Sequence, residues 1–199
     1  MQTLNPDAQA VLDFWFCPEG TPAHGQLRTE WFRKDAAFDA AIAQRFGALV
    51  EAALAGDLRN LRDWPADPGA ALARIVLLDQ FTRNMFRATS RAFAGDALAL
   101  AAAQAMLAAG QDAALRPEQR VFIYLPFEHS EDVALQDRSV ALFSALAAEA
   151  PGFANMLDYA RRHHAVIARF GRFPHRNELL GRASTAAEIA FLQEPGSRF

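Results

Sequence analysis

Signals that start and end α-helices recur along the chain, and they constrain its fold more than any other feature. Asn5 and Asp67, both of a type that caps helices, are each followed by proline, which the first helical position tolerates well. Thr185 and Glu188 have the spacing of a capping box. Between such signals, apolar residues recur three and four positions apart. The predicted helices run approximately over residues 6–17, 38–53, 68–87, 93–109, 117–126, 131–148, 154–170 and 185–192.

One segment is compatible with either a helix or a strand. Val121 to Leu125 is apolar on every side, so its periodicity does not distinguish a buried helix from a buried strand. We assign a helix because no second strand is available to satisfy the backbone of a strand. Pro126 is predicted to kink or end this helix, and Ser130 to cap the next one. The predicted fold class is therefore all-α.

Length and composition predict one domain. The chain has 199 residues, of which 52% are apolar and 22% charged, enough for one sizeable core. We predict a single helical domain over residues 1–199 with an ordered core of about 5–193, in which Trp31 and Trp64 pack. The sequence predicts no secretion signal and no membrane span. It predicts no internal disulfide, because Cys17 is the only cysteine. These features favour a cytoplasmic location, and the net charge of -3 disfavours nucleic acid as a partner.

Residues 77–87 place charges where the helical pattern calls for core. On a wheel of 100° per residue, Asp79 and Arg83 fall on either side of Leu72, in the middle of the apolar face. Enclosed charges must be paired or must face something polar. We therefore expect Asp79 and Arg83 to form a structural pair, and Gln80, Asn84 and Arg87 to be freer to meet a ligand.

Two further polar groups stand out. Glu128 and His129 follow the predicted kink, and a compact loop at 172–177 contains two arginines, a histidine and an asparagine. We hypothesise that these groups converge with the first on one pocket. The candidate ligand-binding residues are Asp79, Gln80, Arg83, Asn84, Arg87, Arg172, His175, Arg176 and Asn177, and Glu128 and His129 are the acid/base candidates.

Four ordered motifs carry a resemblance to a known family. They are VLDFWF at 11–16, LLDQFTRN at 77–84, YLPFEHSE at 124–131 and FGRFPHRN at 170–177, followed by Leu180-Gly181-Arg182 and Ser184-Thr185. Over nearly its whole length the chain resembles the uncharacterised bacterial family called domain of unknown function 924, although Cys17 stands where that family has glycine. The resemblance implies a tetratricopeptide-like array of antiparallel helix pairs, and it supplies no activity.

Three functions remain open for the polar residues. The first is a structural ion-pair network that fixes how the helices stack. The second is a binding site for a small anionic metabolite or an acidic peptide, favoured by six arginines against Glu178 between residues 161 and 182. The third is a hydrolase acting on a phosphate or acyl ester, with Glu128 and His129 as acid and base.

Cofactor and metal signals are weak. A metal site would draw on Glu128, His129, Asp132 and His175, but no helix carries a His-x-x-x-His or Glu-x-x-His pair, so we predict neither metal nor cofactor. His163 and His164 are adjacent in a helix, which predicts that one packs and the other is solvated. The sequence indicates no particular oligomeric state.

Overall fold

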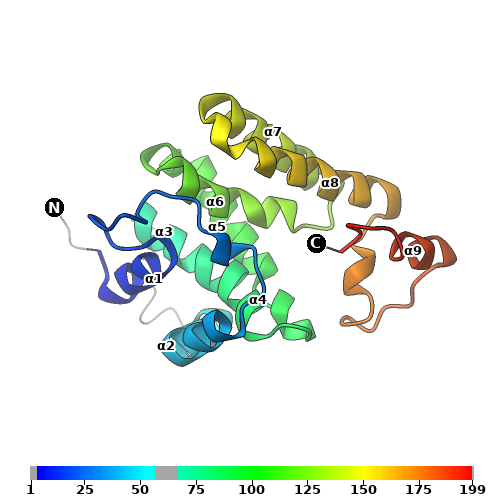
Figure 1. Cartoon of the computed structure of the whole chain (residues 1–199), viewed down its shortest axis with the longest axis horizontal. Helices are drawn as coiled ribbons and strands as arrows, with labels where there is room; N and C mark the ends of the chain where they lie inside the picture. Colours follow the sequence, from blue (N-terminus) through cyan, green and yellow to red (C-terminus); the bar gives the residue numbers. More distant parts are fainter. Residues whose placement is uncertain (1–3, 57–66, 199) are drawn as a thin grey trace. The chain divides into compact units, whose positions relative to one another are not determined.

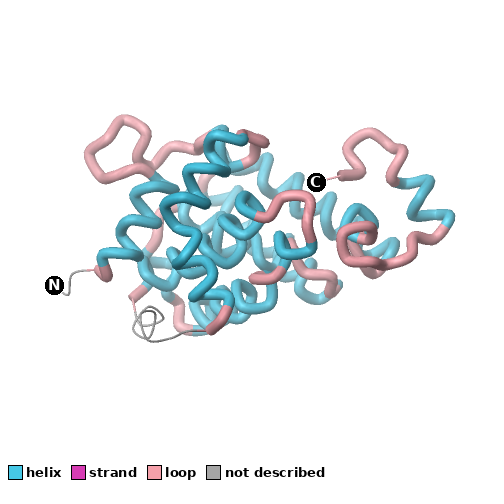
Figure 2. Tube along the Cα trace, turned by 90° about the horizontal axis from the view of Figure 1, so that it is seen from below, coloured by secondary structure: helices cyan, strands magenta, loops and turns pink. Residues whose placement is uncertain are grey.

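A computed structural model describes residues 4–56 and 67–198. Every regular element in these two ranges is helical, and neither contains a strand, so the all-α prediction is confirmed (Figures 1 and 2). Trp64 lies outside the described residues. The described chain forms two compact units, the first from residues up to 87 together with 91–126, the second from 88–90 together with 127 onward. The single-domain assignment stays a prediction.

The first unit holds a core of aromatic side chains. Its helices are α1 (Pro6–Phe16), α2 (Ala36–Leu54), α3 (Pro68–Ile75), η3 (Val76–Phe81), α4 (Thr82–Met85), α5 (Asp96–Ala108) and most of α6 (Pro117–Glu128), with short 3-10 turns at η1 (Thr29–Trp31), η4 (Ser90–Phe93) and η5 (Gln111–Ala114). The ring of Trp15 lies 5.5 Å from that of Phe81 and 5.4 Å from that of Phe122. Trp31 packs on Phe122 at 4.9 Å, as predicted.

The predicted caps of this unit are confirmed. The Asn5 side chain accepts hydrogen bonds from the first backbone N–H groups of α1, and Asp67 accepts one from Ala70 N at 3.0 Å. The run Val121 to Leu125 is helical. Pro126 lies inside α6, which continues to Glu128, so the helix does not end at the proline.

The helix that we predicted over 68–87 contains a π-helical segment. Residues of η3 make the wider turn of a π-helix between α3 and α4, which corrects the assumption of a uniform 100° per residue. Thr82 Oγ1 donates to the carbonyl oxygen of Leu78 at 2.8 Å. A Cβ atom at Gly95 would lie 2.1 Å from that same oxygen, so only glycine permits this close approach. All six side chains of η3 are buried, Asp79 and Gln80 among them.

The second unit is built on a helical hairpin. Its elements are α7 (Val133–Glu149), η6 (Pro151–Phe153), α8 (Ala154–Phe170), η7 (Pro174–Arg176) and α9 (Ala186–Phe191). The short turn η6 connects α7 to α8, and the two long helices pack along each other in antiparallel directions (Figure 1). Gly171 ends α8 in the left-handed conformation, with φ of 68°. The tetratricopeptide-like repetition of such pairs stays a prediction.

One predicted cap in this unit is wrong. Asp132, not Ser130, caps α7, because its carboxylate accepts from Ala134 N at 2.8 Å and from Leu135 N at 3.1 Å. The backbone N–H of Ser130 instead donates to Phe127 O in the turn after α6. The capping box of Thr185 and Glu188 is present at the start of α9.

Candidate functional site

The charged residues of η3 and α4 form an ion-pair cluster in the first unit. Asp79 is fully buried, and its carboxylate lies 3.0 Å from Nη1 of Arg83. Asp96, at the start of α5, lies 3.0 Å from the same nitrogen, and the Gln80 amide donates to Asp79. Burial alone would lower the pKa of Arg83, but the two carboxylates raise the pKa above its ordinary value. The predicted pair of Asp79 and Arg83 is therefore present.

Asn84 and Arg87, which we predicted to be freer to meet a ligand, both bind the carboxylate of Asp39. The Asn84 amide donates to Asp39 Oδ1 at 2.7 Å. Arg87 donates from Nη2 to the same oxygen at 2.9 Å and from Nε to Oδ2. Asp39 lies in the first turn of α2, where its negative charge interacts favourably with the helix dipole. Because this local role explains an acidic residue there, the sequence does not indicate its contacts with Asn84 and Arg87.

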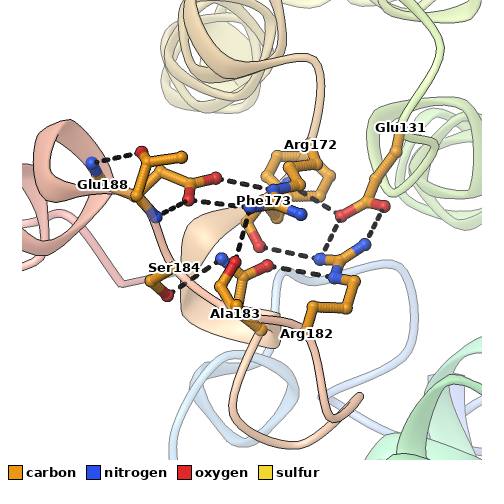
Figure 3. A network of polar contacts seen from close by, with 9 residues as sticks. Glu131, Arg172, Phe173, Arg182, Ala183, Ser184 and Glu188 are labelled. Atoms are coloured by element: carbon orange, nitrogen blue, oxygen red, sulfur yellow. Dashed lines mark hydrogen bonds and ion pairs between the residues drawn. The ribbon is translucent and has the colours of Figure 1, made fainter.

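Two bidentate ion pairs organise the loop after α8 (Figure 3). Arg172 donates from Nε and Nη2 to the carboxylate of Glu188, at 2.6 and 2.8 Å. Arg182 donates from Nη1 and Nη2 to Glu131, at 2.6 and 2.9 Å. The hydrogen bond from Arg172 lowers the pKa of Glu188 to about 2. Burial raises the pKa of Glu131, but hydrogen bonds from Arg182 and from Phe173 N lower the pKa overall.

The same side chains also hold the backbone of this loop. Glu131 accepts from Phe173 N at 2.7 Å, and Arg182 donates to the carbonyl oxygen of Phe173 at 3.2 Å. Arg172 donates to Ala183 O at 2.9 Å. Asn177 accepts from Arg182 Nε at 3.0 Å, and its amide donates to Ser184. Figure 3 shows how these bonds close the loop on itself. Arg172 and Asn177, predicted to bind a ligand, here bind the protein.

A buried Glu–His pair lies beside this loop in the second unit. Glu128 and His163 are 3% and 6% exposed, and Glu128 Oε1 lies 3.1 Å from His163 Nδ1. The same nitrogen lies 2.9 Å from the carbonyl oxygen of Tyr159, which can only accept, so Nδ1 carries the proton. Burial and then the charge of neighbours such as His129 lower the pKa of His163 to about 3. The contact is therefore between the Glu128 carboxyl group and the Nδ1–H group of a neutral imidazole.

The structure therefore pairs Glu128 with His163. The ring of His129 lies 6.4 Å from that of His163, between centroids. His163 is one of two adjacent histidines, and the prediction that one packs and the other is solvated is confirmed. His164 is the more exposed of the two and contacts Asp137 at 2.8 Å. Only the distance along the chain between 128 and 163 hid the pairing.

His175 and Arg176 pack against Phe173. The Arg176 guanidinium lies 4.6 Å from the centroid of the Phe173 ring, and the His175 ring lies 5.5 Å from it. Burial, followed by the positive charge of Arg176, lowers the pKa of His175 to about 4. His175 is therefore neutral at pH 7.

An open pocket lies between α8 and the C-terminal segment of the second unit. Its volume is about 250 Å³, and nine residues line it: Arg162, Ala165, Val166, Arg169, Phe170, Phe191, Pro195, Gly196 and Ser197. The lining contains two arginines and neither Asp nor Glu. Arg169 lies over the rings of Phe170 and Phe191, at 4.6 and 5.7 Å. Arg162 donates to Gly196 O at 3.1 Å. The excess of arginines in 161–182 was the only signal of this pocket in the sequence.

The predicted site residues thus fall into two groups. Asp79, Gln80, Arg83, Asn84 and Arg87 belong to the first unit, and Glu128, His129, Arg172, His175, Arg176 and Asn177 to the second. A pocket shared by both groups stays a prediction. Over residues 4–56 and 67–198, no group of three or more His, Cys, Asp or Glu side chains is placed to hold a metal ion. Nor is any helix in these ranges long and apolar enough to span a membrane.

Comparisons with known proteins agree with the fold. The sequence model of a family described as a bacterial protein of unknown function, DUF924, matches residues 11–196. A solved structure of a protein of unknown function from Agrobacterium tumefaciens is 38% identical, with a TM-score of 0.80, over 94% of this chain and 96% of that one. None of the curated proteins matches. The match covers far more than half of the sequence, and the chain belongs to the DUF924 family.

Proposed function

We propose that this protein binds a small organic anion in the pocket between α8 and the C-terminal segment. The observation that carries the proposal is the lining itself, in which two arginines lie beside apolar walls without Asp or Glu, and Arg169 contacts no carboxylate of the described ranges. A binding pocket typically combines a mostly apolar surface with a few placed polar groups. Positive charge without a balancing carboxylate favours an anion.

The other prominent arginines differ from Arg169 in this respect. Arg83, Arg87 and Arg172 each contact a carboxylate of their own unit within 4 Å. Arg169 contacts no Asp or Glu of the described ranges in this way; its guanidinium lies on two aromatic rings. In our proposal the paired arginines hold the fold, as an ion-pair network does, and Arg169 meets the ligand.

Binding can be tested by calorimetry and by thermal shift. A panel of phosphorylated and carboxylated metabolites is titrated into the full chain at low ionic strength, where exposed charges act most strongly. We expect at least one compound to bind the wild type and to lose affinity in Arg169→Ala. Arg161→Ala is the matched control, because Arg161 is an exposed arginine of α8 that does not line the pocket.

Two results would overturn the proposal. One is the absence of binding by every compound of the panel. The other is binding that Arg169→Ala and Arg161→Ala reduce equally, because an unspecific attraction to the positive surface would do the same. An acidic peptide ending in a free carboxylate belongs in the panel, since its terminal group has the same chemistry.

A hydrolase is the second candidate, and the contact between Glu128 and His163 favours it. A carboxylate hydrogen-bonded to an imidazole is a common arrangement for moving protons during ester hydrolysis. We rank it second because both side chains are almost completely buried. Assays with nitrophenyl phosphate and nitrophenyl acetate would test it, with Glu128→Gln as the variant. Activity that survives Glu128→Gln unchanged would rule out this pair.

A further inference from the structure

We infer that the pocket of Arg162 and Arg169 takes a carboxylate carried on a short apolar chain or ring, in preference to a phosphate. The inference rests on the proposed function and names the chemical class of its ligand. Three features of the described pocket support it: its size, its apolar walls and the guanidinium of Arg169.

The size limits the ligand to a small molecule. The pocket measures about 250 Å³, just below the range of roughly 300 to 1,000 Å³ that is usual for ligand pockets. This volume suits a small organic molecule.

The walls favour an apolar body. Val166, Phe170 and Phe191 line the pocket, and the two phenyl rings lie 5.1 Å apart between centroids. Burying a methylene group against such walls contributes about 0.8 kcal/mol, which corresponds to a roughly fourfold gain in affinity. A phosphate dianion gains nothing from these walls, and its desolvation costs more than that of a carboxylate monoanion.

The guanidinium of Arg169 suits a carboxylate. It lies over the rings of Phe170 and Phe191, at 4.6 and 5.7 Å from their centroids. A guanidinium can form two parallel bonds to a carboxylate or to a phosphate, so the preference for a carboxylate comes from the lower cost of desolvating a monoanion. Lysine at this position would keep the charge and lose this fork.

The C-terminal segment positions the second arginine. Gly196 has a positive φ of 74°, and its carbonyl oxygen accepts from Arg162 Nη2. A Cβ atom at Gly196 would lie 2.8 Å from that nitrogen. Gly196→Ala would therefore move the Arg162 guanidinium without removing its charge. This variant separates the effect of the position of Arg162 from the effect of its charge.

The experiment is a calorimetric series with defined probes. Acetate, butyrate, hexanoate and octanoate are titrated into the full chain, together with hexanamide, hexyl phosphate and inorganic phosphate. We expect affinity to rise roughly fourfold for each buried methylene and to level off once the pocket is full. Hexanamide and hexyl phosphate should each bind at least tenfold more weakly than hexanoate. Inorganic phosphate should not bind.

Variants then separate this inference from the proposed function. Arg169→Lys and Gly196→Ala should each weaken hexanoate several-fold, whereas Arg161→Lys should leave it unchanged. If hexyl phosphate binds more tightly than hexanoate and depends on Arg169, the carboxylate inference is wrong and the anion site stands. If affinity does not change with chain length, the apolar walls play no part and the inference is likewise wrong. If no probe binds, neither proposal holds.

Discussion

Acid should destabilise the second unit through His163, and His163→Asn should remove the part of the loss that this side chain contributes. The imidazole is almost fully buried and donates from Nδ1 to Tyr159 O, with Glu128 at 3.1 Å. Burial lowers its pKa from 6.5 to about 3. The amide nitrogen of asparagine occupies nearly the position of Nδ1, so the variant keeps a donor for Tyr159 and loses the titrating ring.

The sign and size follow from proton linkage. Between pH 6.5 and about 3 the unfolded chain binds a proton at His163 and the folded chain does not, so the free energy of unfolding falls as the pH falls. From pH 7 to pH 5 the difference in protons bound by the unfolded and the folded chain integrates to about 1.4 pH units. This corresponds to a loss of about 2 kcal/mol in the free energy of unfolding. Most carboxylates are still ionised at pH 5, so the window isolates histidines. His175, whose pKa burial lowers to about 4, should add a loss of the same sign and of nearly the same size over this range.

The measurement is urea denaturation at pH 7, 6 and 5, followed by circular dichroism. Tryptophan fluorescence is unsuitable, because the three tryptophans fall at positions 15, 31 and 64, in the sequence of the first unit. Wild type should lose about 2 kcal/mol more than His163→Asn over this range. His164→Asn is the control and should follow the wild type, because that ring is more exposed. Equal losses in wild type and His163→Asn would refute the reasoning.

Two further pairs of substitutions test the first unit by the same denaturation assay, here followed by tryptophan fluorescence. Arg83→Ala leaves Asp79 charged in a fully buried site and should cost about 3 to 5 kcal/mol. Arg87→Ala, at a side chain 35% exposed, should cost about 1 kcal/mol. Equal losses of stability in Arg83→Ala and Arg87→Ala would contradict the distinction between a buried and an exposed ion pair. Gly95→Ala should cost about 3 kcal/mol, because its Cβ would meet the Leu78 carbonyl; Gly47→Ala, whose Cβ would have 3.5 Å to its nearest neighbour, is the control.

The helices were predictable because most of their signals are local. The bounds of α8 at 154 and 170 follow from the apolar spacing and from Gly171, and the caps of α1, α3 and α9 lie within four residues of the bonds they make. The start of α7 was misplaced because Ser130 and Asp132 are both good caps. Asp132 makes the cap, and the intervening Glu131 pairs with Arg182, 51 residues away.

The π-helical segment could not be read from periodicity. A helical wheel assumes one angle per residue, and η3 departs from it over six positions. The close approach of Gly95 to Leu78 belongs to this arrangement, and it joins positions 17 apart in the sequence. In the sequence, Gly95 resembles a glycine at a helix boundary, and nothing indicates that it contacts Leu78.

The site was predictable in residue type but not in partners. Asp79 and Arg83 lie one helical turn apart on an apolar face, and the need to pair enclosed charges predicted their contact. Asp39, 48 residues from Arg87, and His163, 35 residues from Glu128, each had a sufficient local explanation. When a local role such as a helix-dipole contact explains a residue, the sequence gives no further reason to look for a distant partner. Both Asp39 and His163 are residues of this kind.

The same point changes how the excess of arginine should be counted. Between residues 161 and 182 six arginines face one glutamate, which suggested an anion site at Arg172 and Arg176. The fold brings Glu131 to Arg182 and Glu188 to Arg172, and both carboxylates lie outside that stretch of sequence. Charge balance holds in space, so a count along the chain overstates the surplus wherever a loop is closed by distant carboxylates. Arg169 has no such partner among the described residues, and for that reason the pocket beside it, and not the 172–177 loop, is the place to look for an anion.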